Sequence, residues 1–282
     1  MKYNLAFKYR IYPNKEQELL INKTFGCVRF VYNTILYTAN KIYEETGKNK
    51  IITPASLKSE NQFLKEVDSL ALSNAQLNVK RSFTNFFQKR AKFPRFKSKK
   101  NNVKSYTTNC VNNSIRIEEN KYLVLPKLKK VKLKYHREIP KDYKIKSVTL
   151  TNSNGNYYVS VLTEFEKEIQ KMPSNDKVIG LDFSMSELFV SSENQRADYP
   201  RYFRMLEKKL KKLQKSLSRK VKFSKNWYKQ KMKISKLHEY IKNCRRDFLH
   251  KLSKKLSEDY NAVVVENLNM KVMKTFQKIN YN

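Results

Sequence analysis

The charge of this chain constrains its fold more than any other feature. Sixty Lys and Arg stand against 25 Asp and Glu, which gives a formal net charge of +35 over 282 residues. Because like charges repel in a compact state, such a fold is stabilised when a polyanion neutralises its cations. The excess argues against an ordinary metabolic enzyme and favours nucleic acid, or less often an anionic membrane surface, as partner. Hydrophobic residues make up 40% and aromatic residues 12%, so we expect a folded protein and not a disordered basic tail.

The number of cysteines and the length of the apolar runs indicate in which cellular compartment the protein is expected. The three cysteines, at 27, 110 and 244, are far apart and form no C-x-x-C pair. We therefore expect neither a disulfide framework nor a cysteine-based zinc site. The start at Met1 lacks the apolar run of a signal peptide, and no apolar stretch approaches the ~18–20 residues that cross a bilayer. These patterns predict a soluble, cytoplasmic protein that does not bind membranes.

Apolar spacing divides the first 168 residues into a strand, several helices and then further strands. Alternation over Tyr3–Tyr12 predicts the first strand. Asn14 followed three residues later by Gln17 is a capping-box pattern, and it predicts a helix over 15–45 that stops at Gly47. The remaining expected elements are a helix from Thr53-Pro54, a helix over 72–90 whose apolar face includes Phe86 and Phe87, a basic connector over 93–100, strands over 103–108, 114–117, 122–125, 131–136, 145–151 and 157–165, and a hairpin turn at Asn154-Gly155.

The rest of the chain predicts a small sheet interrupted by two long helices. A polar segment over 166–176 is interpreted as a linker. Val178–Asp182 predicts a buried strand with a hairpin partner over 187–191, and Ala262–Glu266 predicts another short strand. Between them lie a helix with leucines at heptad spacing and a helix over 225–258. Because fewer than three clean heptads are present, we expect these helices to pack on the sheet and not to form a dimerising coiled coil.

Two carboxylates follow the apolar strands of this second part. Asp182 and Glu266 each stand at the end of a β-branched apolar run. Neighbouring strands would bring the two carboxylates within reach of one divalent ion, and Mg²⁺ prefers such oxygen ligands. In two-metal sites, ions ~4 Å apart activate a water and stabilise the leaving oxygen of a phosphodiester. Carboxylates at strand ends are also common as caps and turn residues, so the pattern alone leaves both interpretations open.

Motifs spread through most of the chain carry a family resemblance. In order they are Phe7–Pro13, Lys23–Asn33, Phe86-Phe87, Phe93–Lys97, Gly180–Asp182, Tyr199–Tyr202, Asp247–Ser253 and Val264–Leu268. Together they closely resemble TnpB-type transposon proteins, which are compact RNA-guided DNA nucleases related to the type V CRISPR effectors. The resemblance implies a guide RNA transcribed from the transposon end, a double-stranded DNA target next to a short motif, and Mg²⁺ as the cofactor of any cleavage.

The resemblance also implies an α+β multidomain architecture. It implies a wedge-type β-barrel built from 1–12 and 101–168, a helical recognition region over 13–100, a linker over 169–176, and a RuvC-like nuclease domain of RNase H fold over 177–282. The long helical hairpin belongs to that last domain. Asp182 and Glu266 match the first two of the family's three catalytic carboxylates.

The chain departs from the family pattern in its last part. The third carboxylate and the family's C-x-x-C zinc ribbon have no counterpart in the sequence, so we expect no zinc and an incomplete RuvC-like domain. We also expect the strand before Glu266 to form an uncovered apolar edge. Mispositioning a metal ion can cost several kcal/mol of barrier, and each ~1.36 kcal/mol is tenfold in rate. The sequence therefore predicts no useful cleavage by this chain alone.

Basic and aromatic residues of the first half form the candidate nucleic-acid surface. Cations neutralise phosphates and release counterions, while aromatic faces stack on exposed bases. Arg29 and Asn33 lie one helical turn apart and are expected to reach phosphates or base edges together. The complete candidate set is Arg10, Tyr12, Arg29, Phe30, Tyr32, Asn33, Lys80, Arg81, Lys89, Arg90, Lys92, Arg95 and Lys97.

Three functions are compatible with these residues. The first is a TnpB-like RNA-guided DNA-binding protein with an inactive nuclease, either decayed or repurposed and associated with the prokaryotic nucleoid. The second is an active RNA-guided endonuclease or transposase accessory protein whose third carboxylate comes from elsewhere. The third is a non-specific basic RNA-binding protein. The sequence leaves the guide, the DNA motif and the oligomeric state open.

Overall fold

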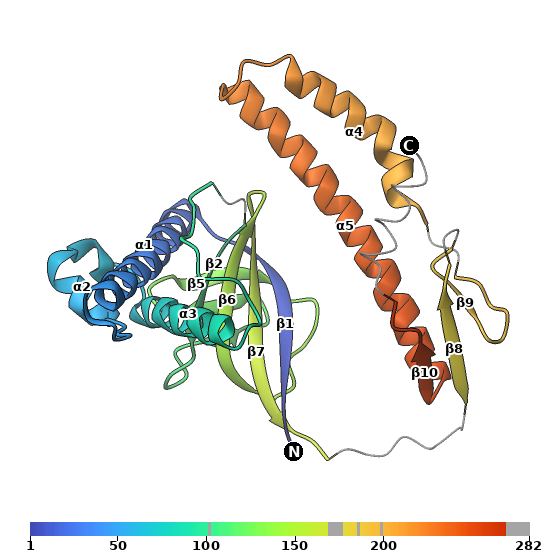
Figure 1. Ribbon diagram of the computed structural model, residues 1–282, viewed down its shortest axis with the longest axis horizontal. Coiled ribbons are helices and arrows are strands. Elements are labelled where there is room, and N and C mark those ends of the chain that lie inside the picture. Colours follow the sequence, from blue (N-terminus) through green and yellow to red (C-terminus); the bar gives the residue numbers. More distant parts are fainter. Residues whose placement is uncertain (101–102, 169–176, 185–186, 198–199, 269–282) are drawn as a thin grey trace. The chain divides into compact units, whose positions relative to one another are not determined.

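The computed structural model describes residues 1–100, 103–168, 177–184, 187–197 and 200–268. The chain separates into two compact units, Met1–Ile169 and Gln170–Asn282 (Figure 1). Each expected strand is present within these residues, with bounds that differ from the expectation by two residues at most. Residues 169–176, which were expected to form the linker, lie outside the described residues.

A curled antiparallel sheet forms the centre of the first unit (Figure 1). Its seven strands have the order β2-β6-β7-β1-β5-β4-β3. We expected a β-barrel, but the strand order ends at β2 on one side and at β3 on the other, so the described strands form an open half-barrel. The strands are β1 (Lys2–Tyr12), β2 (Val103–Asn109), β3 (Arg116–Glu118), β4 (Tyr122–Leu125), β5 (Lys129–Lys134), β6 (Lys144–Ser153) and β7 (Asn156–Glu166).

Alternation in β1 places one row of side chains in the core and the other in solvent. Phe7, Tyr9 and Ile11 are buried, whereas Arg10 and Tyr12 are exposed. The strand pairs antiparallel with β7 along almost its whole length and with β5 at its end. The hairpin between β6 and β7 turns at 154–155, where both residues have the positive φ that this tight turn requires.

Helices cover one face of this sheet. The first, α1 (Lys15–Thr46), begins with the expected capping box and ends at Gly47, whose φ is +65°. After α2 (Pro54–Glu60) and a short 3₁₀ helix (Gln62–Lys65), α3 (Ser69–Phe87) packs against α1 and β2. The expected extension of α3 to residue 90 is wrong, because Lys89 adopts a φ of +57° that a right-handed helix does not tolerate.

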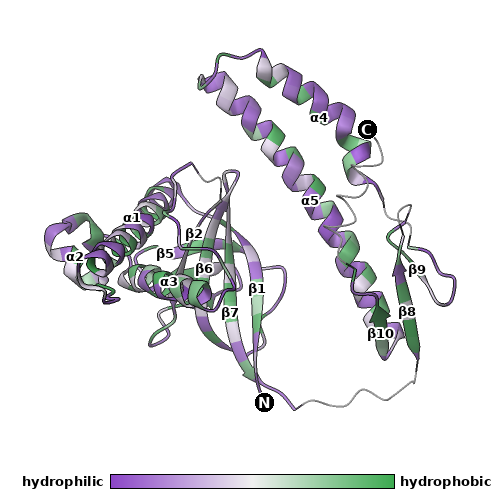
Figure 2. Cartoon of the chain, viewed as in Figure 1, coloured by the Kyte–Doolittle hydropathy of each residue, from purple (hydrophilic) through white to green (hydrophobic). Residues whose placement is uncertain are grey.

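The second unit contains a small mixed sheet and a long helical hairpin. In the sheet order β10-β8-β9, β8 (Val178–Phe183) pairs parallel with β10 (Ala262–Val265) and antiparallel with β9 (Phe189–Ser191). The hairpin consists of α4 (Tyr202–Ser218) and α5 (Lys225–Asp259). Figure 2 colours most of both helices as hydrophilic, with apolar residues interspersed. None of the helices in the described residues is long and apolar enough to cross a membrane.

The two long helices bury their apolar residues mainly against each other, and α5 also contacts the sheet at β10, so the expectation that they pack on the sheet is met only in part. Leu210 of α4 and Leu237 and Ile241 of α5 form their own buried cluster. Meanwhile Val263, Val264 and Val265 of β10 are 39%, 59% and 66% exposed. Apolar stripes on antiparallel neighbours bury each other when the connecting loop is short. The expected apolar edge at β10 is therefore present among the described strands.

Candidate nucleic-acid and metal-binding sites

The parallel pairing of β8 with β10 brings two carboxylates together. The register aligns Leu181 with Val265, and the next residues along the two strands are Asp182 and Glu266. Neighbouring parallel strands place residues of equal register side by side, so these two carboxylates occupy the same end of the sheet. Both line the same two cavities, of about 190 and 460 Å³. The sequence-based expectation that these residues would meet at neighbouring strand ends agrees with this arrangement.

The chemistry of this pair suits a hard divalent cation. Both residues are exposed, and no hydrogen bond or ion pair with another described residue engages either carboxylate. Mg²⁺ is commonly held by one or two carboxylates together with several waters, so the two oxygen donors fit such an ion. Within the described residues, no group of three or more His, Cys, Asp and Glu side chains could hold a metal ion. The pair thus stands as two ligands without a third in this part of the chain.

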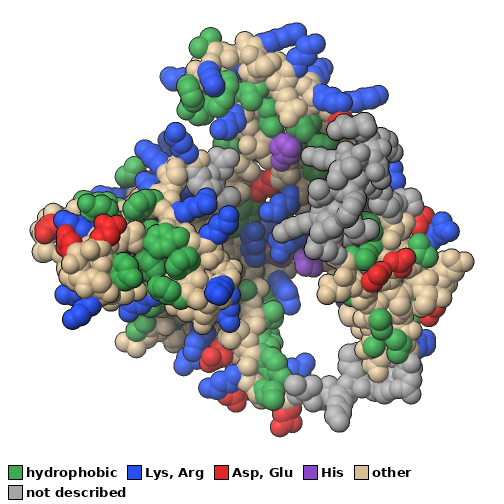
Figure 3. Space-filling model, in the orientation of Figure 1, with side chains coloured by type: hydrophobic (Ala, Val, Ile, Leu, Met, Phe, Trp, Pro, Cys, Tyr) green, Lys and Arg blue, Asp and Glu red, His purple; other side chains and the backbone are tan. Residues whose placement is uncertain are grey.

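Most of the expected nucleic-acid contacts are solvent-exposed. Lys and Arg side chains (blue in Figure 3) spread more widely over the visible face than Asp and Glu (red). Those of α3 and the segment that follows it, Lys80, Arg81, Lys89, Arg90, Lys92 and Arg95, are all exposed. Phe30 is partly exposed and lies edge-on to Phe63, with 5.4 Å between ring centroids. These side chains are accessible to a partner.

On β1, Arg10 is held by its neighbours in the sheet. Its Nη2 donates to Oδ1 of Asn156 at 2.7 Å, and its guanidinium lies 5.2 Å from the ring centroid of Tyr12. The cation–π contact orders both side chains on the outer face of the strand. This face presents a cation and an aromatic ring together.

Asn33 fastens the basic connector, residues 93–100, to α1. Its Nδ2 donates to the carbonyl oxygen of Lys97 at 3.0 Å, and its Oδ1 accepts from the Lys97 backbone N–H at 2.8 Å. The Lys97 ammonium lies 4.1 Å from the ring centroid of Tyr32, which is only 4% exposed. Burial lowers the pKa of Lys97. The structure thus places Tyr32 and Asn33 under Lys97, as supports for the connector.

A cavity of about 420 Å³ lies between α1, the connector and β2. Arg29, Lys97 and Lys104 line it, together with the exposed ring of Phe96. No carboxylate among the described residues forms an ion pair with any of these cations. A pocket of this size, lined by three basic residues and an aromatic ring, fits an anionic, ring-containing ligand such as a nucleotide.

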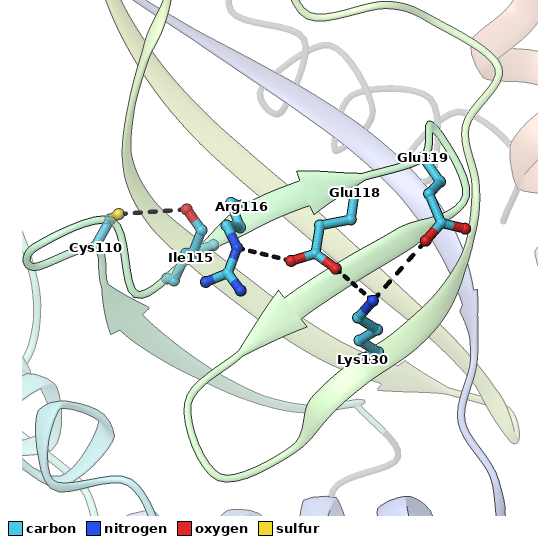
Figure 4. A network of polar contacts seen from close by, with 6 residues as sticks. All are labelled: Cys110, Ile115, Arg116, Glu118, Glu119 and Lys130. Atoms are coloured by element: carbon cyan, nitrogen blue, oxygen red, sulfur yellow. Dashed lines mark hydrogen bonds and ion pairs between the residues drawn. The ribbon is translucent and has the colours of Figure 1, made fainter.

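Cations elsewhere on the same sheet are neutralised, as Figure 4 shows for β3 and β5. The carboxylate of Glu118 accepts from Arg116 at 2.8 Å and from Lys130 at 2.7 Å, and Lys130 lies 3.9 Å from Glu119. Hydrogen bonding from Lys130 and Arg116 lowers the pKa of Glu118. Lys130 is therefore paired with an acidic residue, whereas Lys104, on the same sheet, has no acidic partner among the described residues.

Beside the connector lies an aromatic cluster whose exposure the sequence did not predict. Phe87 was expected in the apolar face of its helix but is 66% exposed. Its ring lies 5.4 Å from that of Phe86, which lies 5.2 Å from that of Phe93. The position of these rings at the end of a helix, immediately before Lys89 and Arg90, was the signal that could have indicated their exposure.

Family models match two parts of the chain. Residues 159–277 match a family described as "Probable transposase", and residues 1–48 match one described as "Helix-turn-helix domain". In the structure, residues 1–48 form strand β1 and one continuous helix, so this segment holds no helix–turn–helix of its own. Together with the two-unit fold and the paired carboxylates, these matches indicate a protein of the transposase class.

Individual relatives specify the family. The chain is 35% identical over 284 aligned positions to the "Putative RNA-guided DNA endonuclease InsQ" of Escherichia coli K12, covering 97% of this chain and 68% of that protein. It is 33% identical to a "Putative RNA-guided DNA endonuclease" of Streptomyces pristinaespiralis, covering 94% of this chain and 67% of that one. The chain therefore belongs to the TnpB-type family of RNA-guided DNA endonucleases, as its motifs suggested.

A solved structure supports the fold. A chain from the cryo-EM structure of the Cas12f1–sgRNA–target DNA complex matches with a TM-score of 0.53 over 95% of this chain and 81% of that one. The sequence identity is 12%, so the likeness extends to the fold alone. It agrees with the mixed α/β architecture and the curled antiparallel sheet.

Proposed function

We propose that the chain is a TnpB-like RNA-guided DNA-binding protein. The cavity of Arg29, Lys97 and Lys104 carries this proposal, because it gathers cations without acidic partners beside an aromatic ring. The relatives named as RNA-guided DNA endonucleases support a guide RNA and DNA as partners. The guide would come from the transposon end, and the DNA target would lie next to a short motif. In such complexes base pairing reads the sequence and the protein reads shape and the short motif.

The proposed division of labour follows the units of the chain. Residues 1–12 and 101–168 form the wedge part, 13–100 the recognition region, 169–176 a linker, and 177–282 the RuvC-like part. The exposed candidate residues, with Arg10, Tyr12 and Phe30 among them, contact phosphates and unpaired bases, together with the half-buried Arg29 and with Lys97. Tyr32 and Asn33 contribute by holding Lys97 in place.

In the second unit, Asp182 and Glu266 would hold Mg²⁺. A bound ion supplies charge stabilisation and an activated water for phosphodiester cleavage. The chain's own two carboxylates would orient it and leave most of its coordination sphere to water. Because no third acidic group joins them among the described residues, we propose that this part binds the ion weakly and that the chain binds DNA without efficient cleavage.

Binding is tested with a matched pair of lysine variants of the full chain. Lys104→Gln removes a cation of the cavity, and Lys130→Gln removes one already paired with Glu118. If Lys104 binds a phosphate, Lys104→Gln should weaken RNA and DNA binding uniformly across sequences and reduce the slope of log affinity against log salt by about 1. Lys130→Gln should leave both unchanged. Equal effects of the two variants would refute a specific role of the cavity.

RNA recovered with the purified chain tests guidance. A single transposon-end species, and tighter binding of DNA matched to it, are the expected results. A mixture of unrelated RNAs would instead establish a non-specific basic RNA-binding protein.

Mg²⁺-dependent cutting of a matched plasmid, abolished by Asp182→Asn but not by Asp247→Asn, would establish an active endonuclease. Asp247 is a suitable control because it is an exposed acid paired with Lys251 on α5.

A further inference from the structure

The turn between α4 and α5 carries an aromatic cluster that the site described above does not use. We call Phe223, Trp227 and Tyr228 the aromatic tip. The ring centroids of Phe223 and Trp227 are 5.6 Å apart, and those of Trp227 and Tyr228 are 5.1 Å apart. Ser224 accepts a hydrogen bond from the Trp227 backbone N–H at 3.1 Å, which fixes the first turn of α5 and the two rings on it. The three rings therefore form one ordered group.

The two outer rings are exposed to solvent, and Trp227 between them is half-buried. Phe223 is 67% exposed and Tyr228 is 54% exposed. Phe223 also adopts a φ of +69°, which is an unfavourable region for a bulky residue other than glycine. Strained positions of this kind persist where the surrounding structure imposes them, and they cluster at functional sites. An exposed ring on a strained backbone gains little for the core, so a role in binding accounts for it better than packing.

The charge around the aromatic tip identifies the partner. Between Glu207 and Glu239 the sequence holds thirteen Lys or Arg and no acidic residue. Lys222 lies 6.0 Å from the ring centroid of Phe223, and Lys231 lies 5.1 Å from that of Trp227. Within the described residues, neither lysine forms an ion pair. Such a surface is complementary to a polyanion.

We propose that the aromatic tip is a base-stacking site for single-stranded nucleic acid. Bases of a single strand expose faces that stack on aromatic rings, while the neighbouring lysines neutralise the backbone. A continuous duplex keeps its base faces stacked inside the helix and offers the rings only its phosphates. The inference goes beyond guided DNA binding, because stacking of this kind depends on neither a guide nor a particular sequence.

The single tryptophan of the chain is a built-in reporter, since Trp227 lies in the aromatic tip. The full chain is titrated with a short oligo(dT) and a short oligo(U), with a blunt duplex of equal length, and with phosphatidylserine vesicles. We expect saturable quenching of the tryptophan emission by the single strands and much weaker quenching by the duplex. Oligo(dT) and oligo(U) distinguish DNA from RNA as the preferred strand. Equal quenching by duplex and single strand, or a response to vesicles alone, would overturn the proposal.

Substitutions at Phe223 separate stacking from folding. Phe223→Leu keeps the apolar bulk but removes the π face, and Phe223→Tyr keeps both. Stacking is worth ~1–3 kcal/mol per base, so Phe223→Leu should weaken oligonucleotide binding roughly 5- to 150-fold, with Phe223→Tyr close to the original protein. Phe203→Ala, at an exposed phenylalanine of α4 outside the aromatic tip, is the matched control and should have no effect. Equal affinities of the Leu and Tyr variants would refute base stacking.

Discussion

Replacing Asn33 with Ala should release the connector from α1. The substitution removes both hydrogen bonds, of 2.8 and 3.0 Å, that join the Asn33 amide to the backbone of Lys97. A net contribution of about 1 kcal/mol for each gives about 2 kcal/mol for the docking of this segment. Since ~1.36 kcal/mol is a factor of ten, the connector should be detached roughly 30 times more often.

Hydrogen exchange measures this directly. The backbone N–H of Lys97 is the group that donates to Asn33, so its exchange should accelerate roughly 30-fold in Asn33→Ala. Nucleic-acid affinity should fall as well, because Lys97 and Phe96 line the cavity beside α1. Asn40→Ala, a partly exposed asparagine of the same helix, is the control and should change neither. Unchanged exchange at Lys97 in Asn33→Ala would show that other contacts hold the connector and that the two Asn33 hydrogen bonds are not needed for its docking.

Three further expectations concern stability. Asp68→Ala removes the N-cap of α3 and leaves the hydroxyl of Thr108 without its acceptor, so thermal or urea unfolding should show a loss of about 2 kcal/mol. Gly155→Ala forces a side chain into a turn with a φ of +80° and should cost about 1 kcal/mol in the same assay. Glu118 has a lowered pKa in the folded chain, so its stabilising effect is complete above the unfolded pKa of ~4.3 and disappears as pH falls through the folded value. Urea midpoints of Glu118→Gln and the original protein should therefore differ at pH 7 and converge as pH falls below the folded pKa of Glu118, and a constant difference would contradict this pairing.

Local patterns predicted the elements because each rests on neighbouring residues. The capping box at Asn14 and Gln17, the stop at Gly47 and the turn at Asn154-Gly155 are all present. The alignment of Asp182 with Glu266 was also predictable, because two apolar runs each ended in a carboxylate. The caps and the turn depend on spacing along the chain, whereas the carboxylate pair rests on a long-range strand pairing that two similar apolar runs indicated.

Features that depend on distant contacts escaped the sequence. The side chain of Asn33 hydrogen-bonds to a backbone 64 residues away, and its spacing from Arg29 gave no sign of this contact. The leucine stripe of α4 had two possible partners, and only the fold selects α5 over the sheet. Exposure of Phe87 and of the aromatic tip was equally hidden, because a phenylalanine has the same apolar signature in a core and on a surface.

The length of α5 sets a scale for the strands that the second unit can engage. Its 35 residues at 1.5 Å per residue make a rod of about 52 Å. A stacked strand advances ~3.4 Å per nucleotide, so a strand lying along the whole rod has about 15 nucleotides. Oligonucleotides much shorter than this can touch only one end of the helix. If a strand lies along α5, its affinity should therefore rise with strand length up to about 15 nucleotides and level off beyond that length.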